Sequence, residues 1–144
     1  PALAPAVRSQ QPRSFMVLRR DQRLRGRFVF DRLYQKGRRL HGQLMVLRTM
    51  PAEPNLLKPD PRDHHPDSAR LAVVVSSKVH KRAVRRNQLR RLLHDHLQGV
   101  LQSPSGPARA RWLLISLKPG CADADPQALL GECSELLAKA GLIP

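Results

Sequence analysis

The sequence predicts an α+β fold, a two-layer sandwich in which helices pack on a small sheet in the order α-β-β-β-α-β-α. Three observations predict this class. The 144 residues are 41% hydrophobic, which suffices for one domain with a core. Three segments have apolar residues at helical spacing, and two short apolar runs are typical of strands. No apolar run approaches the ~18 residues that a membrane span needs, so no membrane partner is expected.

The first predicted elements are a helix over 27–36 and a bent strand or strand pair over 39–50. Gly37 is well placed to end the helix. The helix is indicated by apolar residues at helical spacing: Phe30, Leu33 and Tyr34.

Two segments without periodicity bound the predicted domain. Residues 1–18, rich in Pro, Ala and Gln near their start, are expected to be a flexible tail, which leaves 19–144 as a single α+β domain. Five prolines between residues 51 and 68 predict a long exposed loop rather than an element.

The second half of the chain predicts two further strands and two helices. The β-branched run Leu71–Ser76 is typical of a central strand buried on both faces, and 112–117 is a second apolar strand. The last helix begins with Asp125 as N-cap and Pro126 in its first turn. Between the strands a helix over 82–99 is predicted from one apolar stripe: Leu89, Leu92, Leu93, His96, Leu97 and Val100.

The positive charge is concentrated in two windows. The formal net charge is +15, from 26 Lys and Arg against 11 Asp and Glu. The window 19–39 holds nine basic residues and two acids, and 78–91 holds seven basic residues and no acid. Such a balance predicts a polyanionic partner, nucleic acid ahead of a membrane surface. Two cysteines are too few for a disulfide scaffold and favour a reducing, cytoplasmic location.

The start of the 82–99 helix is the sharpest local feature. Arg86, Arg90 and His94 form one row at spacing four, and Asn87 with Arg91 forms the neighbouring row. Guanidinium forks match phosphate oxygens, and an Asn among them can donate to phosphate or to a ribose hydroxyl. A solvated helix face is the alternative interpretation. Seven cations without an anion would repel one another, however, unless a polyanion neutralises them.

Several motifs occur in a fixed order around this helix. They are Ser77-Lys78, Lys81-Arg82-Ala83-Val84, Arg86-Asn87-Gln88 and Arg90-Arg91-Leu92, preceded by Arg23-Leu24 and followed by Lys118-Pro119. In this order the chain resembles the protein component of bacterial ribonuclease P, over about residues 19–140. Gln88 departs from the family motif, in which a third basic residue completes Arg-Asn-Arg.

The resemblance implies the function. Ribonuclease P is an endoribonuclease that removes the 5′ leader of precursor tRNA, and its partner RNA carries out the hydrolysis with Mg²⁺. The resemblance therefore implies two RNA partners, the catalytic RNA and precursor tRNA, and neither a cofactor nor a catalytic residue on the protein. It also implies a left-handed β-α-β crossover between the strands at 71–76 and 112–117, where most such crossovers are right-handed.

The resemblance also implies two binding surfaces. The leader would lie against Phe30 and Tyr34, on whose rings bases could stack, and against Arg48, at a strand position that is often aromatic in the family. Core packing is the alternative role for Phe30, and Tyr34 is expected to be half exposed. The residues that would bind the catalytic RNA are Lys78, Lys81, Arg82, Arg86, Asn87, Arg90 and Arg91.

Three other classes fit the sequence less well. A basic structural RNA-binding protein, such as a ribosomal protein, would share the charge but not the face of Phe30 and Tyr34. A helix-turn-helix protein needs a short helix before its recognition helix, where this chain has a strand, so DNA is not an expected partner. A metal-dependent nuclease lacks paired carboxylates. The proline-broken loop would not hold the ligand geometry of its cluster, so no metal site is expected at Asp60, Asp63, His64, His65 and Asp67.

Overall fold

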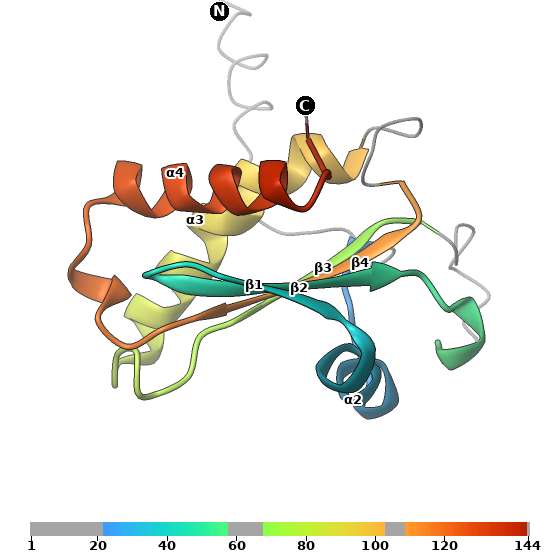
Figure 1. Cartoon of the computed structure of the whole chain (residues 1–144). Coiled ribbons are helices and arrows are strands. Elements are labelled where there is room, and N and C mark those ends of the chain that lie inside the picture. The colour runs from blue at the N-terminus through green and yellow to red at the C-terminus, as the bar shows by residue number, and fades with distance from the viewer. Residues whose placement is uncertain (1–21, 58–67, 103–108, 144) are drawn as a thin grey trace, which may run out of the picture.

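The computed structural model describes residues 22–57, 68–102 and 109–143 and contains a four-stranded sheet with helices on both faces (Figure 1). The strand order is β1-β2-β4-β3, in which β3 and β4 are parallel and the other pairs antiparallel. The predicted α+β class and element order are confirmed. The elements are α2 (Arg27–Lys36), β1 (Arg38–His41), β2 (Met45–Pro51), β3 (Arg70–Val74), α3 (Ala83–Gln102), β4 (Arg111–Leu117) and α4 (Pro126–Lys139).

Helices α3 and α4 cover one face of the sheet and α2 covers part of the other, so the protein has two hydrophobic cores (Figure 1). The larger core contains the inward side chains of α3 and α4, among them Leu93, Leu97 and Leu129. The smaller core lies under α2 and consists of Leu24, Val29, Leu33, Met50, Trp112 and Leu114. Side chains of one strand alternate between the two faces, which is how β2, β3 and β4 each contribute to both cores.

Helix α2 has the predicted bounds and ends at Gly37. The Gly37 N–H donates to the Leu33 carbonyl at 2.9 Å, and a Cβ at this position would lie 2.5 Å from the same oxygen. Since the Gly37 φ of −68° is open to every residue, this close approach is what requires glycine.

The predicted segment 39–50 is a hairpin of β1 and β2. Leu40 pairs with Leu47 and packs against the larger core, and Arg39 pairs with Arg48 on the side that α2 occupies. The pairing register therefore sets two arginines opposite each other on one face of the sheet.

The prediction of a central strand at 71–76 is wrong, because β3 lies at the edge of the sheet. Its β-branched side chains are covered on both faces, Val73 in the larger core and Val74 partly against the smaller one. At the outer edge of β3, on the side away from β4, the Leu24 N–H donates to the Leu71 carbonyl at 3.0 Å. Apolar composition reports how well the faces of a strand are covered, and it does not report the position of the strand in the sheet.

Helix α3 joins β3 to its parallel neighbour β4, so the predicted β-α-β crossover is present. Its left-handed sense stays a prediction. The helix continues to Gln102, past the predicted end, because Leu101 extends the buried stripe. His96 was predicted to lie in this stripe, which is wrong: the residue is exposed, and its Nε2 lies 2.9 Å from the Ser134 Oγ of α4.

The described part of the predicted loop at 51–68 contains regular structure. β2 extends to Pro51, a short 3-10 helix spans Pro54–Leu56, and Leu56 and Leu57 are partly buried against the smaller core. Residues 58–67, with the His and Asp cluster, lie outside the described residues, as does the predicted tail.

Helix α4 begins as predicted, with Asp125 as N-cap and Pro126 in its first position. Both cysteines are buried free thiols. Burial raises the pKa of Cys121, and burial together with the Glu132 carboxylate raises the pKa of Cys133 to about 12, so Cys133 stays protonated.

Candidate nucleic-acid interface

The segment between β3 and α3 is held by hydrogen bonds within the segment itself. The Val79 N–H donates to the Ser76 carbonyl at 3.0 Å, and the Arg82 N–H donates to His80 Nδ1 at 3.1 Å. Val79 is buried. The cationic side chains Lys78, Lys81 and Arg82 are exposed on this ordered turn.

Arg86 has a structural role besides any contact with RNA. Its Nη1 donates to the carbonyls of His80 (2.9 Å) and Lys81 (2.8 Å), so the guanidinium braces the turn that carries the other cations. One turn further along α3, the Arg90 Nη1 donates to the Asn87 Oδ1. The predicted rows on this helix thus form a connected polar surface, which continues to the exposed Arg91.

Arg85 also belongs to this surface, although sequence reasoning did not select it. Its guanidinium donates to Gln88 Oε1 at 3.3 Å and to the Ala122 carbonyl at 3.1 Å. Gln88, which departs from the family motif, therefore binds a neighbouring arginine of the same helix. The bond to Ala122 ties the start of α3 to the 3-10 turn Cys121–Asp123.

The three predicted leader-binding residues lie on the α2 side of the sheet. The Arg48 guanidinium lies over the Tyr34 ring, 4.5 Å from its centroid, and Tyr34 is 50% exposed. Phe30 is partly buried against the smaller core. The structure thus joins the half-buried Arg48 and the exposed Tyr34 into one pair, while Phe30 also packs against the core.

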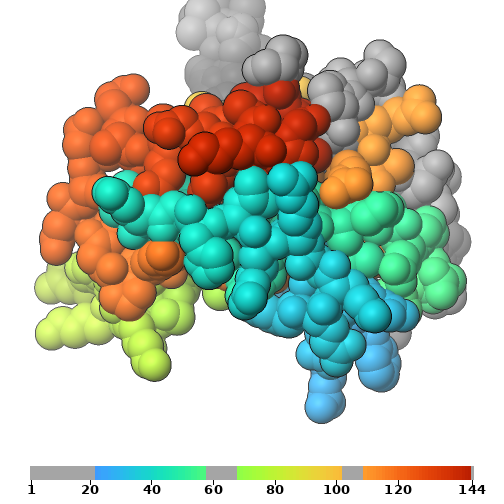
Figure 2. Space-filling view, in the orientation of Figure 1, coloured from blue at the N-terminus to red at the C-terminus, as the bar shows by residue number. Residues whose placement is uncertain are grey.

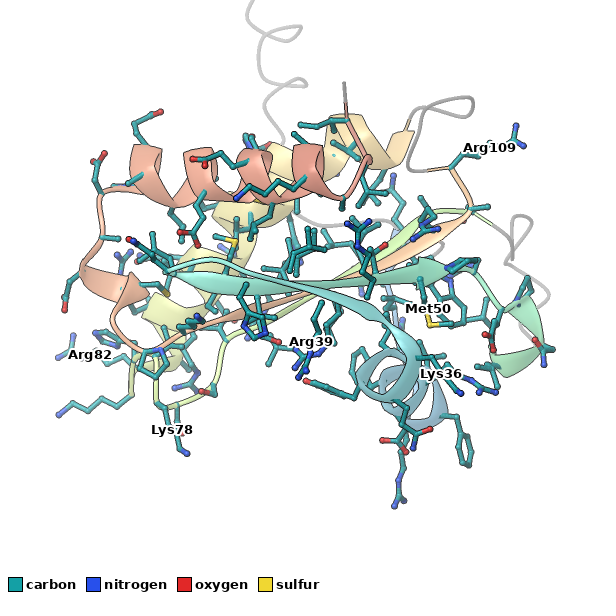
Figure 3. All side chains as sticks on the ribbon, viewed as in Figure 1. Lys36, Arg39, Met50, Lys78, Arg82 and Arg109 are labelled. Carbon is teal, nitrogen blue, oxygen red and sulfur yellow. The ribbon has the colours of Figure 1, made fainter. Side chains whose placement is uncertain are left out.

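Arg39 and His41 extend this face along β1. They are exposed and stand opposite Arg48 and Val46 in the pairing register. Sequence reasoning missed both residues, because only the register shows that they share a face with Arg48. Figure 3 shows Arg39 on the α2 side of the sheet, between α2 and the turn that carries Lys78 and Arg82.

The β1–β2 hairpin lies between the candidate RNA-binding elements. In Figure 2 α4 lies above the hairpin, the segment leading into α3 lies below it to the left, and α2 lies below it to the right. The open part of the sheet face and the start of α3 therefore form neighbouring cationic surfaces.

His94 lies at the inner edge of the basic row of α3. Burial, with repulsion from Arg90 and Arg23, lowers its pKa from 6.5 to about 4. The ring is therefore neutral at pH 7. His94 adds no charge to the basic surface there, in contrast to its neighbour Arg90.

The described part of the chain holds neither a cluster of metal ligands nor a membrane-spanning helix. Across 22–57, 68–102 and 109–143, no three His, Cys, Asp or Glu side chains gather as metal ligands. Within the same ranges, no helix combines the length and apolarity required to cross a membrane.

Comparison with known proteins assigns the family. A family model described as Ribonuclease P matches residues 18–141. The chain belongs to this ribonuclease P protein family. The assignment decides between the ribonuclease P subunit and the ribosomal type of RNA-binding protein, which charge alone left open.

Similar proteins share the family and its fold. The ribonuclease P protein components of Parasynechococcus marenigrum (strain WH8102) and Synechococcus sp. (strain WH7803) are 54% and 52% identical to this chain. The matches cover 88% and 90% of this chain and 98% and 100% of those proteins. The RNase P protein structure of Staphylococcus aureus has a TM-score of 0.67 at 20% identity, covering 85% of this chain and 98% of that one. That of Thermotoga maritima has a TM-score of 0.59 at 21% identity, covering 81% and 96%.

Family membership defines the activity to which this chain contributes. Ribonuclease P is an endoribonuclease that processes the 5′ leader of tRNA, and the protein acts as its subunit. A protein component implies the ribonuclease P RNA as its partner. The chain is therefore the protein subunit of an endoribonuclease whose other component is an RNA.

Proposed function

We propose that the protein binds the ribonuclease P RNA through the start of α3 and the 5′ leader of precursor tRNA through the open sheet face. The first surface comprises Lys78, Lys81, Arg82, Arg86, Asn87, Arg90 and Arg91. The second comprises Phe30, Tyr34 and Arg48, extended by Arg39 and His41.

One observation carries the proposal: the half-buried Arg48 guanidinium lies over the exposed Tyr34 ring, beside a part of the sheet face that α2 leaves uncovered. A guanidinium on an aromatic ring offers both a flat stacking surface and a phosphate ligand. A single-stranded leader presents unpaired bases and phosphates at once, so it matches this pair. Base stacking on such side chains contributes ~1–3 kcal/mol per base with little sequence preference.

The role of the protein in cleavage is electrostatic and geometric. Its cations offset phosphate repulsion between catalytic RNA and substrate. The second surface, called the leader face below, favours binding of precursor tRNA over mature tRNA. Mg²⁺ acts through the RNA, and the protein itself binds no cofactor. The enzyme works in the cytoplasm, where precursor tRNA is processed.

The decisive experiment measures cleavage of a precursor tRNA by bacterial ribonuclease P RNA at low Mg²⁺, with and without this protein. The protein should stimulate cleavage strongly, and the protein alone should cleave nothing. The double variant Arg82→Ala/Arg91→Ala, which removes two exposed cations of the first surface, should lose most of the stimulation. Arg86 is a poorer first choice, since it braces the turn through His80 and Lys81.

The matched control is Arg109→Ala/Lys139→Ala, which removes the same two charges from exposed positions. Figure 3 shows Arg109 at the opposite end of the molecule from Lys78 and Arg82. The control should stimulate like the unaltered protein. Equal loss in both variants would mean that net charge acts alone, and cleavage without the RNA would mean that the protein has an active site.

Salt dependence tests the electrostatic part. If roughly six to ten cations contact phosphate, affinity for the ribonuclease P RNA should fall on the order of 10³-fold or more between 50 and 200 mM salt. A shallow dependence would contradict the proposed phosphate contacts.

A further inference from the structure

The β1–β2 turn holds a carboxylate from α4. Glu132 Oε1 accepts from the Gln43 N–H at 2.9 Å, and its Oε2 accepts from the N–H groups of Leu44 (2.7 Å) and Met45 (3.0 Å). Three successive backbone donors thus converge on one side chain almost ninety residues away. Hydrogen bonds to an ionised acceptor are among the strongest in proteins.

The same turn is fixed from a second side by Lys118, which follows β4. The Lys118 Nζ donates to the Gly42 carbonyl at 2.6 Å, and its backbone N–H donates to the Leu44 carbonyl at 2.8 Å. The Gly42 N–H donates to the Met45 carbonyl at 2.8 Å. The position of the turn is therefore tied both to α4 and to the end of β4.

Gly42 leaves the space that the carboxylate occupies. A Cβ at this position would overlap Glu132 Oε2 and would lie 2.6 Å from Glu132 Cδ. The Gly42 φ does not lie in the left-handed region, so the backbone itself would accept alanine. Glycine is needed here because of Glu132.

β1 has few other interactions to hold its position. It is a four-residue edge strand, and its one apolar side chain, Leu40, is only partly buried. Its Arg39 faces Arg48 across the ladder, and like charges in directly opposite positions destabilise a strand pair. Short exposed edge strands of this kind open locally at low cost.

We infer that Glu132 is a positioning residue for the leader face: its carboxylate fixes the β1–β2 turn and so holds Arg39 opposite the pair of Arg48 and Tyr34. The carboxylate is not proposed to contact RNA itself, because it accepts hydrogen bonds from the backbone of its own chain. The inference rests on the proposed leader face. It adds that α4, on the opposite side of the sheet, controls the geometry of that face.

The test compares the affinity of the assembled holoenzyme for precursor tRNA and for mature tRNA. The ratio of the first affinity to the second isolates the contribution of the leader. Glu132→Ala should lower this ratio about fivefold, the factor that corresponds to the net contribution of one hydrogen bond. Affinity for mature tRNA and for the ribonuclease P RNA should not change. Glu135→Ala removes the same charge from an exposed position on the same helix and should leave the ratio unchanged.

Gly42→Ala gives an independent second test. Its Cβ should displace the carboxylate, so this variant should lower the ratio as Glu132→Ala does. In the Glu132→Ala background the added methyl group meets no oxygen, and Gly42→Ala should then have no further effect. Amide hydrogen exchange should speed up at residues 43–45 in each variant.

Three results would overturn the inference. One is an unchanged ratio in Glu132→Ala and Gly42→Ala. Another is an equal loss of affinity for all three RNAs, which would mean a general folding role. A third is a Gly42→Ala effect that persists in the Glu132→Ala background.

Tyr34→Ala separates this failure from failure of the proposed function. If Tyr34→Ala lowers the ratio and Glu132→Ala does not, the positioning role alone is wrong. If Tyr34→Ala also leaves the ratio unchanged, the leader face is wrong and the inference falls with it.

Discussion

The two faces of the sheet carry side chains of the same strands but differ in how far helices cover them. On one face α3 and α4 cover the strands, and side chains such as Leu47 and Ile115 are buried in the larger core. On the other face α2 covers one end, over Trp112 and Leu114, while Arg39 is exposed and Arg48 is half-buried. Coverage by helices, rather than strand composition, thus divides this sheet into a stabilising face and the face proposed to bind the leader.

The largest effect is expected where the covered face is opened. Leu93 is fully buried between α3 and the sheet, so Leu93→Ala should lower the free energy of unfolding by about 3–5 kcal/mol through lost burial and a cavity. Urea denaturation measures this change. Val84→Ala, on the exposed side of the same helix, should change stability by less than about 0.5 kcal/mol. Similar losses in the two variants would mean that α3 does not anchor the core.

A substitution on the face that α2 leaves open should weaken binding and leave stability nearly unchanged. Tyr34→Ala should leave stability nearly unchanged and weaken leader binding by ~1–3 kcal/mol per stacked base. Titration of the holoenzyme with precursor tRNA measures the loss. Phe28→Ala is the matched control, because Phe28 is 72% exposed on the same helix but is not the ring that Arg48 covers. An equal loss in Phe28→Ala would place the stacking surface on the outside of α2.

Elements with local signals were predictable from the sequence. The bounds of α2 and the cap of α4 follow from apolar spacing and from Gly37, Asp125 and Pro126, which act within one helical turn. The basic start of α3 was equally visible, since its cations are neighbours in sequence.

Features that depend on distant pairing were not predictable. The edge position of β3 depends on which strands pair, and no local pattern encodes that choice. Arg39 joins the candidate site only through its register with Arg48. Glu132 lies far along the chain from the turn it binds, and its residue type alone gives no sign of that contact.

His94 lies at the boundary between the covered and exposed sides of α3, and it makes stability depend on pH. Its folded-state pKa of about 4 lies below its ordinary value of 6.5, so below pH 6.5 the unfolded chain binds a proton that the folded chain does not. Stability contributed by the neutral ring is complete above pH 6.5 and is lost as the pH falls toward 4.

Because the ring is partly exposed, the loss should be about 1 kcal/mol after discounting for solvent screening. Denaturation of the unaltered protein and of His94→Gln at pH 7 and pH 5 measures it. The variant should show a smaller difference between the two pH values. An unchanged difference would assign the pH dependence to other groups.

The smallest effect tests whether the exposed surface of α3 accepts another cation at the position where this chain departs from its family. Gln88→Arg should steepen the dependence of log affinity on log salt concentration by about 0.7–0.9, the value for one added phosphate contact. Stability should fall by only a few tenths of a kcal/mol, because Arg85 lies three residues away on the helix and loses its bond to Gln88. Binding of the ribonuclease P RNA at a series of salt concentrations measures the slope. Gln127→Arg adds the same charge at an exposed position of α4 and should leave it unchanged. An unchanged slope in Gln88→Arg would mean that this turn of α3 faces no phosphate, because a new cation within reach of one must release a counterion.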